Sequence, residues 1–189
     1  MKSIITILLG LFICLPVMGA DKAKEEFEKT KALAEKGNRV AQFRLGMAYH
    51  KGTGVPKNDK EAVNWWRKAA VQGFATAQYN LGMMYEDDHG VPQDYKEAIK
   101  WYRKSAEQGV LYAQYNLGWM YKRGEGVMED YVTAYAWFNI AQANGNKNSM
   151  AAKDMIAKAR KMSPEQIAKA EELSKEMIKK NPKLIQKKK

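Results

Sequence analysis

One segment recurs three times along the chain at a spacing of 36 residues. Its copies begin at Ala41, Ala77 and Ala113 and read AQFRLGMAY, AQYNLGMMY and AQYNLGWMY. Glycine-containing loops and later alanine–tryptophan segments keep the same register. A fixed period of this length is typical of repeat architectures, in which each unit buries its apolar face against its neighbours. The chain is therefore predicted to be an array of stacked units rather than a single closed core.

Each unit is predicted to contain two helices. In the first segment, Ala41, Leu45 and Tyr49 are four residues apart and share one helix face. Gly46 lies close to that face, where the absence of a Cβ lets another helix approach closely. After the glycine-containing loop, alanine and tryptophan follow the i, i+3, i+4, i+7 pattern from Ala62. This order predicts a helix–turn–helix unit.

The motifs Ala-x-x-x-Leu-Gly-x-x-Tyr, Gly-x-Gly-Val and Ala-x-x-Trp-aromatic resemble the Sel1-like repeat, a relative of the tetratricopeptide repeat. The resemblance is strongest from Ala41 to Gly145. It implies an all-α, right-handed α-solenoid of about three 36-residue helix-turn-helix Sel1-like repeats with helical caps and a concave surface. It also implies a protein–protein scaffold, often in bacterial envelopes and at host–microbe interfaces. Two departures, Asp88 and Met128, lie in loops and leave the expected fold unchanged.

The repeat boundaries divide the chain. We predict a signal peptide over 1–20, an N-terminal capping helix over 21–40, repeats over 41–76, 77–112 and 113–148, C-terminal capping helices over 149–180 and a basic tail over 181–189. The first residues combine a basic start, an uncharged run from Ile4 to Leu15 and small residues at Gly19 and Ala20. A membrane span needs about 20 apolar residues, so an uncleaved anchor is the lesser alternative. We expect a periplasmic or secreted protein.

Composition excludes several kinds of chemistry. Cys14 is the only cysteine and lies in the predicted signal peptide, so neither a disulfide framework nor a cysteine-based zinc site is expected. The two histidines do not occupy equivalent repeat positions, and the loop Glu86–His89 is interpreted as solvated. We expect no cofactor, no metal site and no enzymatic activity. The alternative is a cell-wall-related, β-lactamase-like hydrolase, as claimed for cysteine-rich Sel1-like relatives.

A second apolar stripe lies on nearly the opposite side of each first helix. A surface helix needs only one such stripe, so the second predicts a further neighbour, inside the array or outside it. The tetratricopeptide resemblance places these positions on the concave side, where asparagine can hold a ligand's backbone. The predicted partner-binding residues are Phe43, Arg44, Met47, Tyr79, Asn80, Met83, Tyr112, Tyr115, Asn116 and Trp119. Several of these residue types are enriched in interfaces.

Packing between helices is the other interpretation of this stripe. It is an equal alternative for Phe43, Tyr79 and Met83, because aromatic side chains are often found in cores. For the third-unit residues Tyr112, Asn116 and Trp119, binding is the favoured interpretation. The expected partner is a peptide or protein segment in the concave groove.

Positive charge is concentrated at the C-terminal end. The formal net charge is +11, and residues 153–189 hold 12 Lys or Arg against 5 Asp or Glu. The tail is interpreted as solvated and frayed at its end. Its functional alternative is attraction to an anionic envelope surface. Nucleic acid is not expected as a partner of an exported protein, and the sequence does not indicate an oligomeric state.

Overall fold

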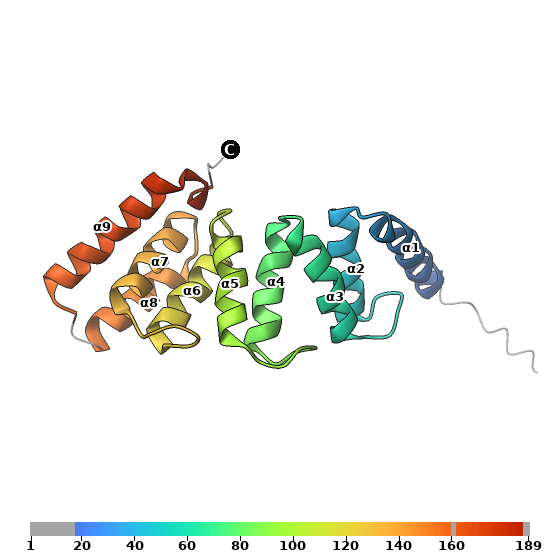
Figure 1. Cartoon of the computed structure of the whole chain (residues 1–189), viewed down its shortest axis with the longest axis horizontal. Coiled ribbons are helices and arrows are strands. Elements are labelled where there is room, and N and C mark those ends of the chain that lie inside the picture. The colour runs from blue at the N-terminus through green and yellow to red at the C-terminus, as the bar shows by residue number, and fades with distance from the viewer. Residues whose placement is uncertain (1–17, 160–161, 187–189) are drawn as a thin grey trace, which may run out of the picture.

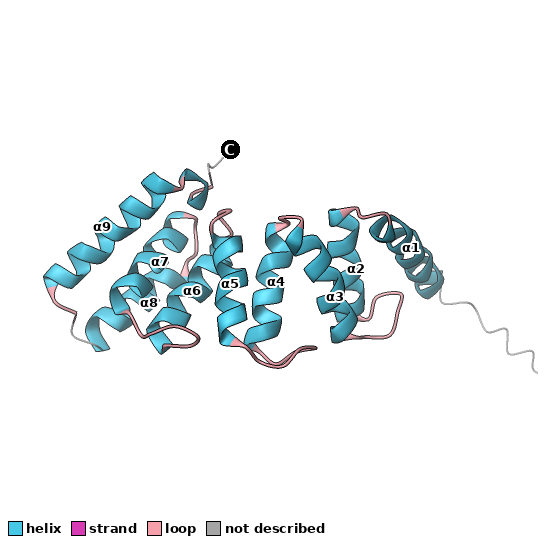
Figure 2. Ribbon diagram, viewed as in Figure 1, coloured by secondary structure: helices cyan, strands magenta, loops and turns pink. Residues whose placement is uncertain are grey.

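The computed structural model describes residues 18–159 and 162–186, and within these ranges every regular element is a helix (Figure 2). In chain order the elements are α1 (Met18–Glu35), α2 (Arg39–Lys51), α3 (Asp59–Val71), α4 (Ala75–Glu86), α5 (Tyr95–Ala106), α6 (Leu111–Arg123), α7 (Tyr131–Ala143), α8 (Asn148–Ala159), α9 (Pro164–Lys180) and the 3₁₀ helix η1 (Pro182–Leu184). Residues 1–17 of the predicted signal peptide and 187–189 of the predicted tail lie outside the described residues. The helices pack along an elongated array, which confirms the predicted all-helical repeat architecture (Figure 1).

Capping residues set where the helices begin and end. Asn58, Asp94 and Asp130 precede the three second helices, and each side chain accepts a hydrogen bond from a backbone N–H of the first turn. Gly52 ends α2 in the left-handed region, at φ 71°. The equivalent residue of the next unit, Asp88, also has a positive φ, of 59°. The departure from glycine at this position therefore leaves the loop geometry intact.

The glycine of each Leu-Gly pair lets the two helices of a unit approach closely. A Cβ placed on Gly46 would lie 2.5 Å from the Trp66 ring of α3. A Cβ placed on Gly82 would lie 2.4 Å from the Tyr102 ring, and one placed on Gly118 would lie 2.5 Å from the Phe138 ring. Real Cβ contacts are not this short, so the glycine is required by packing. The predicted role of Gly46 is confirmed.

A buried glutamine in each first helix connects neighbouring units, a role that we did not predict. Gln42, Gln78 and Gln114 are at most 5% exposed. Each Nε2 donates to a carbonyl of the preceding helix, that of Ala34, Ala70 or Ala106, at 3.0–3.1 Å. Each Oε1 accepts from an amide at the end of the second helix of its own unit, that of Gln72, Gln108 or Asn144, at 2.7–2.8 Å. Burial of these amides is favourable because their hydrogen bonds are made inside the array.

Both ends of the array are covered by helices. Phe27 and Ala34 of α1 form a buried cluster with Ala41 and Leu45 of α2. At the other end, α8 and α9 both pack against α7. The start of α9 has the predicted capping box, with Ser163 and Gln166 bonding each other's backbone N–H groups.

The segment after α9 returns to the array. Figure 1 shows α9 running back along α7, so that η1 lies near the end of α5. Leu184 is 3% exposed and belongs to a cluster with Trp137 and Ile140. The prediction of a solvated tail is therefore wrong for residues 181–186. Lysines are frequent in the predicted tail 181–189, but residues 181–186 contain only Lys183, and Leu184 is buried in a cluster with Trp137 and Ile140.

Candidate functional site

The ten predicted partner-binding residues lie along α2, α4 and α6, on a surface that we name the first-helix face. Nδ2 of Asn80 on α4 lies 3.6 Å from the Sδ atom of Met47 on α2. The Tyr79 ring of α4 and the Tyr112 ring of α6 have centroids 6.2 Å apart. These contacts cross both unit boundaries, so residues predicted from three separate repeats form one surface.

Most aromatic and methionine side chains of this face are half-buried by their neighbours. The Phe43 ring lies 4.9 Å from the Phe74 ring, between centroids. Tyr115 and Trp119 lie 5.5 and 5.6 Å from the buried ring of Phe138. Packing between helices, considered above for the first two units, therefore also applies to Tyr115 and Trp119. Tyr112 differs because it is 59% exposed.

The two asparagines of the face make contacts within the array. Asn80 is 8% exposed, and its amide reaches only the Met47 sulfur, a weak acceptor. Asn116 Nδ2 donates to Tyr102 Oη at 3.0 Å. Holding a ligand's backbone at either position would require these amides to exchange their present partners. We therefore give the asparagines a smaller role in binding than the sequence predicted.

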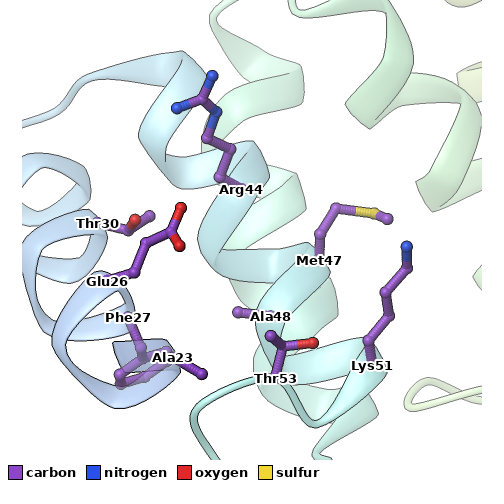
Figure 3. Close-up of a pocket in the computed structure, with 9 residues that line it drawn as sticks. All are labelled: Ala23, Glu26, Phe27, Thr30, Arg44, Met47, Ala48, Lys51 and Thr53. Carbon is purple, nitrogen blue, oxygen red and sulfur yellow. The ribbon is translucent and has the colours of Figure 1, made fainter. Parts of the chain in front are cut away.

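An open cleft lies at the N-terminal end of the face, between α1 and α2. Its volume is ≈ 390 Å³, and its lining includes Phe27, Arg44, Met47, Ala48 and Lys51. Figure 3 shows Glu26 and Thr30 of α1 projecting toward α2, which contributes Arg44, Met47 and Ala48. Within the described part of the chain, the side chains of Arg44 and Lys51 form no hydrogen bond or ion pair. The cleft thus combines an apolar floor with two available cations.

A second cleft lies at the other end of the face, between α6 and α8. It has a volume of ≈ 320 Å³ and is lined by Lys122, Met155, Ile156 and Ala159. The Nζ atom of Lys122 is also 5.6 Å from the centroid of the Trp119 ring. Sequence reasoning missed the apolar contribution of α8, because this helix lacks the Leu-Gly-x-x-Tyr signature.

A partly buried carboxylate lies near the middle of the face. Glu86 Oε2 accepts a hydrogen bond from Tyr102 Oη at 2.5 Å, and Tyr102 in turn accepts from Asn116. Burial raises the pKa of the Glu86 carboxyl, an effect that the hydrogen bond from Tyr102 only partly offsets. Burial and the nearby Glu86 also raise the pKa of the Tyr102 hydroxyl. The network links α4, α5 and α6 through polar groups that are mutually satisfied.

Over residues 18–159 and 162–186, no helix combines the length and apolar character needed to cross a membrane. In the same ranges, no three His, Cys, Asp or Glu residues are grouped so that they could hold a metal ion. Asp87, Asp88 and His89 are exposed, as predicted for a solvated loop, but the prediction is wrong for Glu86, which ends α4 and is half-buried against Tyr102.

Comparison with known proteins gives the family. The Sel1 repeat family matches residues 39–74, 75–110 and 111–146. A Sel1 repeat protein from Oxalobacter formigenes is 38% identical with a TM-score of 0.63, over 69% of this chain and 98% of the other. A protective antigen present in uropathogenic Escherichia coli strains, displaying an SLR fold, is 33% identical with a TM-score of 0.62. That match covers 85% of this chain but only 42% of the antigen, so the chain spans less than half of the antigen's length.

No curated protein matches the chain. The family match rests on three adjacent units, and the helix pairs α2–α3, α4–α5 and α6–α7 occupy those same residues. Sequence and structure thus agree on the unit and on its number. The chain belongs to the Sel1 repeat family.

Proposed function

We propose that this protein is an exported, non-enzymatic interaction module that binds a peptide or protein segment along the first-helix face. Its setting would be envelope regulation or host interaction. The observation that carries the proposal is the cleft between α1 and α2, where Arg44 and Lys51 flank apolar side chains. Tyr112 offers an exposed aromatic ring further along the same face. Exposed arginine and tyrosine beside apolar surface are the residue types that dominate binding energy in interfaces.

The cleft favours a ligand that carries both an acidic and an apolar group. A carboxylate would meet the guanidinium of Arg44 or the ammonium of Lys51, while an apolar side chain would enter between Phe27 and Met47. Truncation of a well-buried anchor in such an interface costs about 2 kcal/mol or more. Glu26 shares the cleft and would repel a carboxylate placed on the α1 side. We therefore place the acidic group of the ligand nearer to α2.

Export is part of the proposal, and it rests on the layout of residues 1–20. The basic start, apolar run and small residues are those of a secretory signal peptide. The similar protein from uropathogenic Escherichia coli is a protective antigen, which accords with a protein outside the cytoplasm. The partner would then be a component of the envelope or of a host.

The test is a crosslinking pull-down from the native cell envelope with three folded forms of the protein. They are the unchanged chain, a variant with Arg44→Glu and Tyr112→Ser, and a control with Val71→Ser. Val71 is 69% exposed on α3 and lies outside the first-helix face, so its variant controls for the loss of surface apolar area. We expect one or a few proteins to be captured by the unchanged chain and the control, and lost with the double variant. Identical capture by all three forms would refute the assignment to this face.

A further inference from the structure

The last described residues of the chain are bound by the array at a site that shares no residue with the first-helix face. The carbonyl oxygen of Leu184 accepts from Gln114 Nε2 at 2.8 Å and from Asn144 Nδ2 at 2.6 Å. The Oδ1 atom of the same Asn144 accepts from the backbone N–H of Gln186 at 2.8 Å. One amide side chain thus holds a carbonyl and an N–H of the bound segment, two residues apart. Main-chain recognition of this kind accepts many sequences.

Selectivity at this site comes from one apolar side chain and one glycine. Leu184 is 3% exposed and packs in the cluster that contains Trp137 and Ile140 of α7. A Cβ placed on Gly109 would lie 2.7 Å from the carbonyl oxygen of Lys183, so only glycine allows this approach. Lys183 and Gln186 are exposed, whereas Ile185 is half-buried and packs against the same cluster. The site therefore recognises a leucine at the end of a 3₁₀ turn, with a half-buried isoleucine beside it.

The third repeat is specialised for this contact. The position of Ile140 is occupied by Lys68 and Lys104 in the first two repeats. There the lysine covers a tryptophan ring, with Nζ 3.8 Å from the centroid of Trp65 and 4.6 Å from that of Trp101. The third repeat replaces this lysine by isoleucine, and replaces the glutamine found at 72 and 108 by Asn144. Trp137 of the third repeat is 5% exposed and belongs to the same buried cluster as Leu184, against which Met177 and Ile178 of α9 also pack.

The equivalent places in the other repeats show that the array does not need such a segment. Among the described residues, no atom lies within 4 Å of a Cβ built on Gly37 or Gly73, the counterparts of Gly109. In these repeats the hydrogen bond between the two glutamine side chains forms without such a segment, for example from Gln72 Nε2 to Gln42 Oε1. The segment itself is held by one buried side chain and a few hydrogen bonds, and segments with few buried contacts open more readily than the core.

We infer that this place on the third repeat is a second binding site, for a peptide that presents one buried leucine at the end of a 3₁₀ turn, and that residues 181–186 are its internal competitor. A partner peptide of this chemistry would displace the segment and form the same bonds with Gln114 and Asn144. The partner's leucine would take the place of Leu184 beside Trp137 and Ile140, so the apolar surface of the array stays covered after the exchange.

The test uses a dye-labelled peptide with the sequence of residues 179–189 and the full chain in three forms. The unchanged chain keeps its own segment in the site, and Leu184→Asp removes the leucine from it. The third form adds Asn144→Ala to Leu184→Asp. Fluorescence anisotropy should show at least about tenfold tighter binding to Leu184→Asp than to the unchanged chain, because the competitor is gone. The added Asn144→Ala should weaken binding by about tenfold, because two hydrogen bonds are lost. A peptide with aspartate in place of the leucine is the control.

Several outcomes would overturn the inference. One is a folded Leu184→Asp chain that does not bind the peptide, or that binds the aspartate peptide equally well. Another is a dimer of the unchanged chain that dissociates on Leu184→Asp, since the occupant would then be a second copy. If Leu184→Asp does not fold, hydrogen exchange of the unchanged chain decides. The Gln186 N–H should exchange at least about tenfold faster than buried amides of α7, and exchange only together with α7 would show a permanent structural contact.

Discussion

Replacing Gly118 by alanine tests whether close approach of the two helices in a unit is what the glycine provides. A Cβ at this position would lie 2.5 Å from Cε1 of Phe138 and 2.7 Å from Cδ1. The ring is fully buried and has Tyr115 and Trp119 beside it, so it has little room to move. Overpacking of a filled core costs about 1–3 kcal/mol, and this contact is at the severe end.

Helix propensity acts in the opposite direction, since alanine in a helix interior is favoured over glycine by about 1 kcal/mol. The expected net loss is therefore about 2 kcal/mol in the free energy of unfolding, or roughly 4–8 °C in the melting temperature for a chain of this size. Urea and thermal unfolding followed by circular dichroism measure both quantities.

A double-mutant cycle with Phe138→Leu separates the clash from any other effect of the alanine. Removing the ring should reduce the cost of Gly118→Ala by about 1 kcal/mol or more, because the two side chains then no longer overlap. Equal costs in both backgrounds, or a more stable Gly118→Ala protein, would refute the close-approach argument.

Three further predictions concern the first-helix face and its loops. Burial raises the pKa of Glu86, so its carboxyl binds a proton more tightly in the folded protein than in the unfolded chain. At neutral pH the carboxyl is charged, and burial of this charge lowers the stability of the folded protein. Glu86→Gln should therefore have a higher melting temperature than the unchanged protein at pH 7. This difference in melting temperature should shrink as the pH falls toward 4.5, the ordinary pKa of a glutamate carboxyl. A difference that stays constant with pH in calorimetry would contradict this. Trp119→Ala should lower the free energy of unfolding by about 2–4 kcal/mol, since the ring packs on Phe138. A loss of less than about 0.5 kcal/mol, which is typical of a surface substitution, would show that the Trp119 ring is free to bind a partner. Asp88→Gly should raise stability by up to about 1 kcal/mol, because relief of the left-handed backbone exceeds the loss of a side-chain hydrogen bond; destabilisation in urea unfolding would argue against this balance.

The repeated motifs were sufficient to predict the units, because helix periodicity and close packing are local properties of each unit. Leu45 and Ala62 are fully buried, as the stripes that contain them require. Gly46 meets the Trp66 ring, as its place beside the stripe suggested. The same motifs also held the signal for the buried glutamines, since the dipeptide Ala-Gln recurs in every unit. A repeated polar residue at a buried position indicates a hydrogen bond that also repeats.

The candidate site was harder to predict, because exposure depends on the distance between neighbouring helices. The stripe that contains Tyr79 and Trp119 was identified correctly as a second apolar surface. Sequence alone did not show how much of it the adjacent first helices and α8 would cover. The α1–α2 cleft was equally hidden, because α1 lines it with Glu26 and Phe27, which belong to no full repeat. The ends of an array are where the repeat pattern is least informative.

The C-terminal segment shows which departures from a repeat carry information. The composition of the tail 181–189 predicts solvation, since its lysines outnumber Leu184 and Ile185, yet Leu184 is 3% exposed. The matching signal was in the third repeat, where Ile140 replaces a lysine and Asn144 replaces a glutamine. Neither change is notable alone, because isoleucine and asparagine are ordinary residues in helices and at their ends. Together they remove the charged cover of a tryptophan and provide an amide that can hold a main chain. Where a repeat loses a polar cover that its neighbours keep, an apolar segment can pack in its place, and in this chain Leu184 joins the cluster of Trp137 and Ile140, together with α9.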